Sequence, residues 1–402
     1  MSSTLTSSSM YTRASRGGGA VHIDGVTIVL VLSIALLGLV MVTSASVSIA
    51  SQETGQPFFY LERQLLLTLI GGACAALLFC IPSQLLEKIS VPLLVAAIAM
   101  LALVFVPGLG HTVNGSRRWL QLAGLNFQVS ELARVLVLIY VASYAVRREE
   151  ALRTTFGGLV KPLGLLVLVG ALLLAEPDFG AATVLFATGF GILFVAGARL
   201  RYVLAMTLIA GAGFAALAIS SSYRLRRLTT FLDPWADPYN SGFQLTQSLI
   251  AIGRGQWFGV GLGESVQKLF YLPEAHTDFL FAVLAEELGL AGVVATLALF
   301  LALVWRSFHI ARLASTAGLK FQSYLAAGFG LWVGIQAFIN MGVNMGVLPT
   351  KGLTLPFMSY GRSSLIVALA WVGLLLRVYH EAMVETRGAA TVRQRGVVME
   401  GE

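Results

Sequence analysis

Long apolar runs alternate with short polar connections along most of the chain. A transmembrane helix needs about 20 predominantly apolar residues, and ten runs of the sequence meet this requirement. They are centred near residues 35, 73, 98, 138, 168, 189, 211, 291, 334 and 370. The pattern therefore predicts an all-α polytopic membrane protein with about ten transmembrane helices.

One connection, residues 221–277, is much longer than the others and separates the seventh run from the eighth. Long loops inside compact architectures are usually functional or disordered. This loop is dense in aromatic residues and in turn sequences such as "DPWADP" and "GVGLGES", so we expect a packed cap on the outer surface of the membrane. Gly259, Gly261 and Gly263 are expected to form packing turns rather than a nucleotide-binding loop, because no strand precedes them.

The composition supports a membrane protein, because 57% of the 402 residues are hydrophobic and only 12% are charged. The mean hydropathy of +0.81 lies outside the range of soluble proteins. Lys and Arg favour the cytoplasmic side of a membrane. If the N-terminus is cytoplasmic, sixteen of the 27 Lys and Arg residues are on that side and only six are in short outer connections. Both termini are therefore expected in the cytoplasm, and no nucleic-acid partner is expected for the net charge of +7.

This topology divides the chain into three regions. Residues 1–22 are polar and rich in Ser and Gly, which favours a disordered cytoplasmic tail. Residues 23–380 form the expected ten-helix membrane domain, and residues 381–402 form a second cytoplasmic tail.

A small set of cations runs against the charge rule. Six of them stand at expected outer helix ends or in short outer loops, namely Arg63, Arg117, Arg118, Arg134, Lys351 and Arg362. Cations at or inside a membrane are costly without a partner, so the set predicts an anion-binding site at the outer face. The alternative for each residue is that its long side chain reaches the lipid headgroups.

Charged residues gather at the start of the eighth run, in "LPEAHTDFLFAVLAEELG". Asp278 is either the N-cap of this helix, a position that Asp favours, or a general base made more basic by a partly dry environment. Thr277 could provide the cap instead. Glu286 could line the same cavity more deeply, while Glu287 points away toward another helix, but structural pairing is the favoured role of both.

Two other polar groups admit two interpretations each. Glu274, His276 and Asp278 could hold a metal ion, although one histidine and two carboxylates in an irregular turn are a weak signal. Glu131 and Arg134 are three residues apart, hence on one helix face. They form either a structural ion pair or a pair that holds an arginine ready for phosphate.

Two outer connections are rich in turn-forming and polar residues. The stretch "AEPDFGAA" predicts a tight turn that carries Glu176 and Asp178. The stretch "VLPTKGLTLPFMSYGRSS" carries Lys351 and Ser359 and predicts a re-entrant or tightly folded loop. Irregular backbone at membrane depth is tolerated only where it lines a cavity or is buried in protein.

These stretches carry a resemblance to a known family. The chain resembles the SEDS proteins (shape, elongation, division and sporulation), and within them the FtsW-like cell-division branch, from about residue 24 to residue 380. The matching stretches are "GSRRWLQL", "SELAR", "EPDFG", "FLDPWADPYNSGFQLTQSLIAIGRG", "GVGLGESVQKLFYLPEAHTDFLFAVLAEELG" and "GVLPTKGLTLPFMSYGRSS". The last two are long and specific.

The resemblance implies a peptidoglycan glycosyltransferase that acts at the outer face of the bacterial inner membrane, at the division septum. Its substrate would be lipid II, an undecaprenyl-pyrophosphate-linked disaccharide pentapeptide. Its partners would be a class B penicillin-binding protein and other membrane proteins of the division machinery. In the family, the aspartate matching Asp278 is the proposed catalytic residue. Positions around the central cavity match Arg63, Arg118, Glu131, Asp178 and Lys351.

The sequence departs from the family pattern at four positions. Val129 stands where the family usually has Pro, and Arg134 stands where it has Lys, which keeps the charge but changes the geometry. Glu176 replaces Gln and is expected to add a negative charge. Arg362 replaces Gly and restricts the backbone of the preceding loop.

Residues and resemblance together predict one reaction. Glycosyl transfer from a lipid pyrophosphate needs a base on the acceptor hydroxyl and cations on the departing anion. Asp278 is the expected base, and His276 could orient it or the substrate. No second carboxylate is placed as a nucleophile, so inversion at the anomeric carbon is expected. The candidate substrate-binding residues are Arg63, Arg118, Glu131, Arg134, Asp178, His276, Lys351 and Ser359.

A divalent cation, Mg²⁺ or Mn²⁺, could assist the pyrophosphate, but no ligand set in the sequence demands one. The alternative function is a flippase for the lipid-linked precursor, because charges inside a helical bundle suit a transporter as well. A flippase should also carry cations deep in its cavity or on the inner side, whereas the charges of this chain are expected to gather at the outer mouth.

Overall fold

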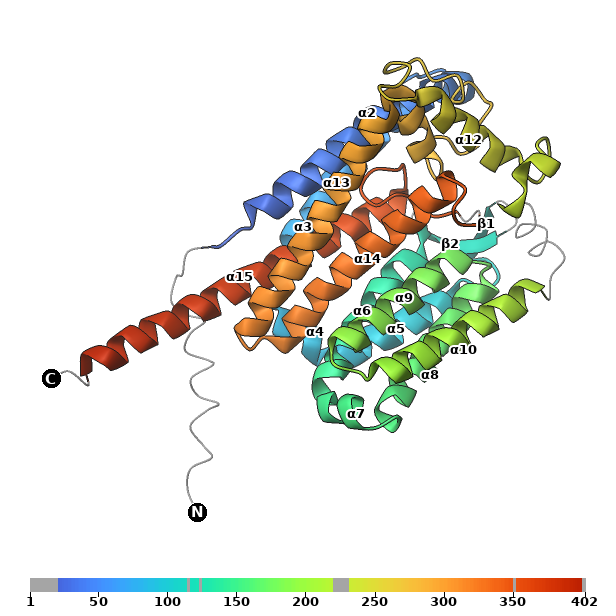
Figure 1. The fold of residues 1–402 in the computed structure, drawn as a ribbon. Coiled ribbons are helices and arrows are strands. Elements are labelled where there is room, and N and C mark those ends of the chain that lie inside the picture. The colour runs from blue at the N-terminus through green and yellow to red at the C-terminus, as the bar shows by residue number, and fades with distance from the viewer. Residues whose placement is uncertain (1–20, 114–115, 123–124, 220–230, 350–351, 400–402) are drawn as a thin grey trace.

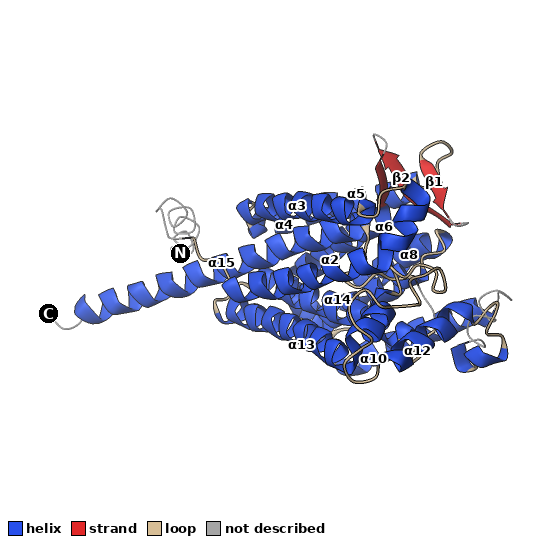
Figure 2. Ribbon diagram, turned by 90° about the horizontal axis from the view of Figure 1, so that it is seen from above, coloured by secondary structure: helices blue, strands red, loops and turns tan. Residues whose placement is uncertain are grey.

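The computed structural model describes residues 21–399, apart from residues 114–115, 123–124, 220–230 and 350–351. Helices dominate the described chain (Figures 1 and 2). Their bounds are α2 Gly25–Thr54, α3 Phe59–Cys80, α4 Ser83–Lys88, α5 Ser90–Leu103, α6 Val129–Arg147, α7 Glu149–Thr154, α8 Gly157–Ala175, α9 Phe179–Val195, α10 Leu200–Ile219, α12 Phe243–Gly255, α13 Leu280–Thr316, α14 Lys320–Asn344 and α15 Arg362–Met399.

The ten predicted spans each correspond to an apolar helix. In the described chain, seven helices are long and apolar enough to cross a membrane, namely α2, α3, α6, α8, α13, α14 and the 362–388 part of α15. The other three predicted spans correspond to α5, α9 and the 200–213 part of α10, which are apolar but shorter. The polytopic all-α prediction is therefore confirmed. Helix α15 continues without a break to Met399 and projects from the bundle through most of the region expected as a tail (Figure 1).

Helices α6, α14 and α15 are the most buried of the seven membrane-length helices and form the core of the bundle. Trp332 of α14 stacks on Trp371 of α15 with ring centroids 5.1 Å apart, and Phe329 packs edge-on against Trp371 at 5.8 Å. Helix α3 lies against α15 through small residues. A Cβ at Gly373, for example, would lie 2.2 Å from the Ala75 carbonyl oxygen. Such close approach is typical of helix pairs in membranes, where no hydrophobic force holds them together.

A small antiparallel sheet was not predicted. It consists of β1 Gly110–Val113, β2 Ser116–Leu122 and β3 Leu125–Gln128, in the order β1-β2-β3. It lies beyond α5 and α6, at the same end of the bundle as α12 and the start of α13 (Figures 1 and 2). We call this end, where Asp278 precedes α13, the site end.

The described part of the long loop packs on the bundle, but several of its aromatic side chains are exposed. Its described part contains η2 Pro234–Ala236 and α12, which packs on α13. Tyr239, Trp257 and Phe258 are exposed, the last at 85%. The expected packed cap is therefore present in the described part of the loop, but it packs through residues such as Leu245 and Ala251 rather than through these three aromatic side chains.

Glycines allow the long loop to pack closely on α13 at a bend in that helix. The bend lies at Gly289, where φ is 64° and ψ is −162°. The Val260 N–H donates to the Glu286 carbonyl at 3.0 Å, and the Leu290 N–H donates to the Gln256 carbonyl at 2.9 Å. A Cβ at Gly259, where φ is 80°, would lie 2.1 Å from the Glu287 carbonyl oxygen. The predicted packing-turn role is thus confirmed for Gly259, whereas an added Cβ at Gly263 would meet no atom within 4 Å.

Candidate active site

Asp278 lies just before α13 and does not cap it. The N-cap residue is Phe279, which offers no capping side chain. Thr277 does not cap either, because its hydroxyl donates to the Glu274 carbonyl at 3.2 Å and to the Glu274 carboxylate at 2.7 Å. Both capping hypotheses are therefore wrong, and the Asp278 carboxylate is left available for chemistry.

The Asp278 carboxyl occupies a narrow, partly buried position beside the 352–355 segment. A Cβ at Gly352 would lie 2.8 Å from Oδ2 of Asp278. Burial raises the pKa of the Asp278 carboxyl to about 7, and the charges of Glu274 and Asp178 add to the shift while Arg118 opposes it. A carboxyl with a pKa near neutrality is matched to proton transfer at physiological pH.

Two asparagines that sequence reasoning missed hold the backbone at this point. Nδ2 of Asn340 and Nδ2 of Asn344 both donate to the Asp278 carbonyl oxygen, at 2.8 Å and 3.0 Å. Both residues belong to α14 and are buried. Their spacing of four residues within an apolar helix could have revealed them, since it places the two amide side chains on one face of the helix.

His276 packs in a cluster of aromatic rings. Its ring centroid lies 4.6 Å from that of Tyr60 on α3 and 5.7 Å from that of Tyr360. Its carbonyl accepts a hydrogen bond from the Tyr360 N–H at 3.0 Å. Burial lowers the pKa of His276, against the influence of Glu274 and Glu53. The His276 ring and carbonyl therefore tie the turn before α13 to α3 and to the loop before α15.

Arg118 and Asp178 meet at the turn between α8 and α9. Arg118 of β2 donates to the carbonyls of Glu176 and Pro177, at 3.1 Å and 2.7 Å. Asp178 caps α9 by accepting from the Ala181 N–H at 3.0 Å. It also accepts from the Ser130 hydroxyl at 3.0 Å. Both side chains thus have structural contacts as well as a place near the Asp278 carboxyl.

Glu176 does not add the expected negative charge. Its carboxyl is fully buried, and neither oxygen has a hydrogen-bond partner among the described residues. Burial raises its pKa to about 8, with a further contribution from Asp178. Near pH 7 this side chain is a neutral acid, so it resembles the glutamine that the family usually has here.

Glu131 and Arg134 form a buried ion pair deeper in the bundle, on α6. Nη1 of Arg134 donates to Oε1 of Gln336 at 3.2 Å, and Nε2 of Gln336 donates to the Thr354 carbonyl at 3.0 Å. This geometry supports the structural interpretation of the pair, since the guanidinium is engaged on two sides. It also links the pair to the loop before α15.

The loop before α15 is tightly folded, as predicted. Leu355, Phe357 and Met358 are buried, and Nε2 of Gln64 on α3 donates to the Met358 carbonyl at 3.4 Å. The Ser359 hydroxyl oxygen accepts from the Leu355 N–H at 3.0 Å and closes the turn. Arg362 is the first residue of α15, so the loss of glycine there is compatible with a helical backbone.

The remaining candidates are not brought to Asp278 by any described contact. Arg63 is exposed near the start of α3, with its guanidinium 4.1 Å from the centroid of the Phe59 ring. Lys351 lies outside the described residues. In the described parts of the chain, no three His, Cys, Asp or Glu side chains are grouped to hold a metal ion, so the metal hypothesis for Glu274, His276 and Asp278 lacks geometric support.

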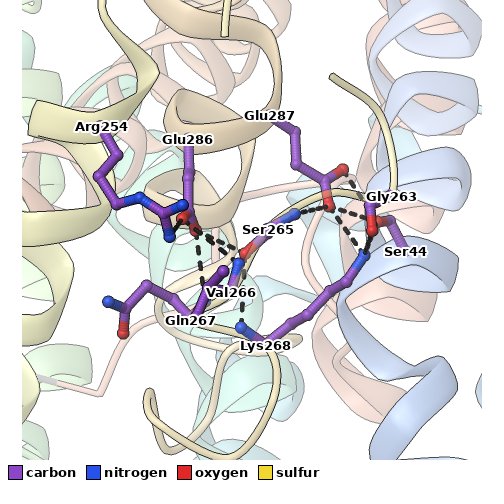
Figure 3. Close-up of polar contacts among 9 residues, drawn as sticks. All are labelled: Ser44, Arg254, Gly263, Ser265, Val266, Gln267, Lys268, Glu286 and Glu287. Carbon is purple, nitrogen blue, oxygen red and sulfur yellow. Dashed lines mark hydrogen bonds and ion pairs between the residues drawn. The ribbon is translucent and has the colours of Figure 1, made fainter. Parts of the chain in front are cut away.

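Glu286 and Glu287 form a buried ionic network with the long loop (Figure 3). The Glu286 carboxylate accepts from Arg254 at 2.8 Å and from the Ser265 hydroxyl at 2.5 Å. The Glu287 carboxylate accepts from the Ser44 hydroxyl of α2 at 2.6 Å. The predicted structural pairing is confirmed, and Glu286 faces the loop rather than the Asp278 site.

Lys268 completes the network from the loop side. Its ammonium donates to Oε1 of Glu287 at 3.1 Å, to the Ser44 hydroxyl at 3.1 Å and to the Gly263 carbonyl at 2.5 Å (Figure 3). Two buried carboxylates are thereby matched by two cations, as buried charges require. The network fastens the loop to α13 and α2 about two helical turns beyond Asp278.

Residues 25–383 match the family model described as the cell cycle protein family of FtsW, RodA and SpoVE. The chain is 56% identical over 353 residues to a Thioalkalivibrio sulfidiphilus protein named probable peptidoglycan glycosyltransferase FtsW, with 88% of each chain covered. A Nitrosococcus halophilus protein of the same name is 54% identical, over 91% of this chain and 95% of that protein.

Solved structures show the same similarity. A chain described in a study of the structural coordination of polymerization and crosslinking by a peptidoglycan synthase complex has a TM-score of 0.73 and 32% identity, covering 90% of this chain and 98% of that one. The rod-shape-determining protein RodA of Thermus thermophilus has a TM-score of 0.65 and 31% identity, covering 90% and 97%. The chain therefore belongs to the FtsW, RodA and SpoVE family of cell cycle proteins, the SEDS family, and is FtsW-like.

Proposed function

We propose that the chain is a peptidoglycan glycosyltransferase that polymerises lipid II into glycan strands, with Asp278 as the general base. The observation that carries the proposal is the Asp278 carboxyl, which is partly buried, has a pKa near 7 and is free of capping duty in a chain 56% identical to a probable peptidoglycan glycosyltransferase. An ionised carboxylate in such a place accepts a proton efficiently.

In the proposed reaction, the acceptor sugar hydroxyl donates a hydrogen bond to the Asp278 carboxylate. As the hydroxyl oxygen attacks the anomeric carbon of the donor sugar, its proton passes to Asp278. The bond from that carbon to the pyrophosphate oxygen breaks, and the lipid pyrophosphate leaves with the bonding electrons. Direct displacement inverts the anomeric carbon, since a retaining route needs a second carboxylate about 5 Å away as nucleophile.

Cations at the site end stabilise the departing pyrophosphate in this proposal. Arg118 is the best-placed described candidate, because its charge acts on the Asp278 carboxyl and its side chain is anchored on the Glu176 and Pro177 carbonyls. Arg63 and Lys351 are further candidates. Charge-assisted contacts from such cations to the pyrophosphate are stronger than neutral ones. Arg134 is already engaged by Glu131 and Gln336, so it supports the deep end of the site rather than the leaving group. His276, Asp178 and Ser359 shape the site around the substrate.

The proposal extends to location and partners. The site end faces the outside of the bacterial inner membrane, both termini lie in the cytoplasm, and the protein acts at the division septum. A class B penicillin-binding protein crosslinks the product, together with other membrane proteins of the division machinery. The similarity to a chain of a peptidoglycan synthase complex that couples polymerization to crosslinking supports such a partner.

Purified protein with lipid II tests the function, with and without the cognate penicillin-binding protein. Glycan strands should form and be sensitive to a muramidase. A parallel assay should follow fluorescent lipid II across the bilayer of proteoliposomes. Translocation without polymer in either condition would replace the proposed enzyme by a flippase.

A further inference from the structure

Three amide side chains form a ladder along one face of α14. Gln336, Asn340 and Asn344 are spaced by four residues, so they lie one above another on the helix. All three are buried, with at most 2% of each residue exposed. Buried amides are costly unless they are hydrogen-bonded, and each of these bonds a backbone carbonyl of a segment that borders the site.

Asn344 caps α13 from a neighbouring helix. The first N–H groups of an α-helix lack partners within the helix, and the N-cap residue Phe279 has no side-chain acceptor. Oδ1 of Asn344 accepts from the Ala282 N–H at 3.1 Å, and its Nδ2 donates to the Asp278 carbonyl at 3.0 Å. Since α14 supplies the acceptor, the Asp278 carboxylate need not turn back to the helix.

Asn340 joins the two segments that meet at the Asp278 carboxylate. Its Nδ2 donates to the Asp278 carbonyl at 2.8 Å and to the Leu353 carbonyl at 2.6 Å. The neighbouring Gly352 is the residue that lies against Oδ2 of Asp278. One amide group therefore ties the Asp278 backbone to the 352–353 segment, against which the Asp278 carboxylate lies.

Gln336 anchors the ladder at its deep end. It bonds the Thr354 carbonyl and the Arg134 guanidinium. Gln336 and Asn340 thus bond the backbone carbonyls of Thr354 and Leu353. Asn340 and Asn344 both bond the Asp278 carbonyl. A local shift of Asp278 would have to break bonds to both asparagines.

We propose that Asn340 and Asn344 are positioning residues of the polymerisation site, which hold the Asp278 carboxylate against Gly352 in the geometry needed to accept the proton. This inference rests on the proposed function. A misplacement of about 1 Å at a reacting group can cost about 100-fold in rate. Loss of either asparagine should therefore lower the polymerisation rate about 10- to 100-fold, with little change in the affinity for lipid II.

The test compares Asn340→Leu and Asn344→Leu with a matched control on the same helix. Gln322 is also a buried amide of α14, but it lies at the opposite end and donates to the Ser83 hydroxyl at 2.9 Å and to Glu381 at 3.2 Å. The variant Gln322→Leu removes a comparable buried amide far from Asp278. Polymerisation of lipid II is measured with the full-length proteins in complex with the cognate penicillin-binding protein.

A second measurement follows the protonation of the Asp278 carboxyl independently of polymerisation activity. A carbodiimide with an amine labels the protonated carboxyl, and mass spectrometry of the peptide gives the labelled fraction at each pH. In the wild type the midpoint should lie near 7. In both asparagine variants it should move at least about one pH unit toward the ordinary aspartate value near 4, because the carboxyl relaxes toward water. Glu274, Arg118 and Asp178 are unchanged in every variant.

Slow polymerisation with a shifted midpoint in the asparagine variants, and neither change in Gln322→Leu, supports the proposal. An unshifted midpoint overturns it, whatever the rate, because the amides would then serve packing alone. If the wild type does not polymerise lipid II, the proposed function fails separately, and the labelling still decides whether the ladder positions Asp278. Should a leucine variant not fold, Asn340→Ala and Asn344→Ala, which remove the same hydrogen bonds without adding bulk or charge, carry the same expectation.

Discussion

Removal of the Lys268 ammonium should open the long loop far more than removal of the Arg254 guanidinium. Both cations pair with a fully buried glutamate, at 3.1 Å and 2.8 Å. The Lys268 side chain is only 10% exposed, whereas that of Arg254 is 42% exposed. Burial, rather than the slightly shorter distance, decides the comparison, because water screens the arginine pair.

The magnitudes follow from the partners that remain. Breaking a buried pair costs about 3–5 kcal/mol. In Lys268→Met, Glu287 keeps the Ser44 hydroxyl at 2.6 Å and the Ser265 N–H at 3.4 Å, which favours the lower limit of about 3 kcal/mol. That value corresponds to a roughly 100-fold larger open population of the loop. Arg254→Met should cost about 1 kcal/mol, or about fivefold.

Hydrogen exchange at the Val260 and Gly261 amides measures this opening, because their N–H groups donate to the Glu286 and Glu287 carbonyls at 3.0 Å and 3.1 Å. Exchange there should accelerate in proportion to the open population. Adding Glu287→Gln to Lys268→Met removes the unpaired charge and should restore part of the protection. Equal acceleration in the two single variants, or a larger one in Arg254→Met, would refute the reasoning.

Three further predictions follow from the site. Gly352→Ala should lower the polymerisation rate about tenfold without unfolding the protein. The new Cβ would lie 2.8 Å from Oδ2 of Asp278 and would displace the carboxylate. Gly253→Ala, where the added Cβ meets no atom within 4 Å, is its control. The polymerisation rate should rise about fivefold from pH 6 to pH 7 and level off above pH 8, because the base must be ionised and its pKa is about 7; a flat pH–rate profile would contradict the base assignment. Glu176→Gln should raise the melting temperature little at pH 5 and progressively more toward pH 8. The folded-state pKa of Glu176 is raised from 4.5 to about 8, so the wild type loses stability as the pH rises through this window while glutamine does not titrate. An equal gap in melting temperature at pH 5 and pH 8 would exclude ionisation as the cause.

Much of the architecture was predictable from local pattern. Apolar runs of span length mark the helices, because a bilayer imposes that length on every crossing segment. The proline- and glycine-rich stretch before α15 predicted a tightly folded loop, which the buried Phe357 and Met358 confirm. The pairing of Glu286 and Glu287 was also predictable, because two adjacent carboxylates inside an apolar run must find partners.

Other features depend on contacts between distant segments. Asp278 could not be freed from capping by sequence reasoning, because the cap comes from Asn344, 66 residues away. The charge of Glu176 depends on its complete burial, which its place in a proline-containing turn sequence does not reveal. The sheet over residues 110–128 was missed because its strands are short, and the exposure of Trp257 was missed because aromatic density alone does not say which face a side chain occupies.

Asp278→Asn tests the central claim most directly. The amide keeps the shape of the side chain but cannot accept the proton, so polymer formation from lipid II should fall about 100- to 10,000-fold, with the penicillin-binding protein still bound. Asp237→Asn is the matched control, because among the described residues that carboxylate bonds Asn240 and Ser241 of its own loop. If Asp278→Asn makes polymer at the rate of the wild type and of Asp237→Asn, Asp278 is not the base.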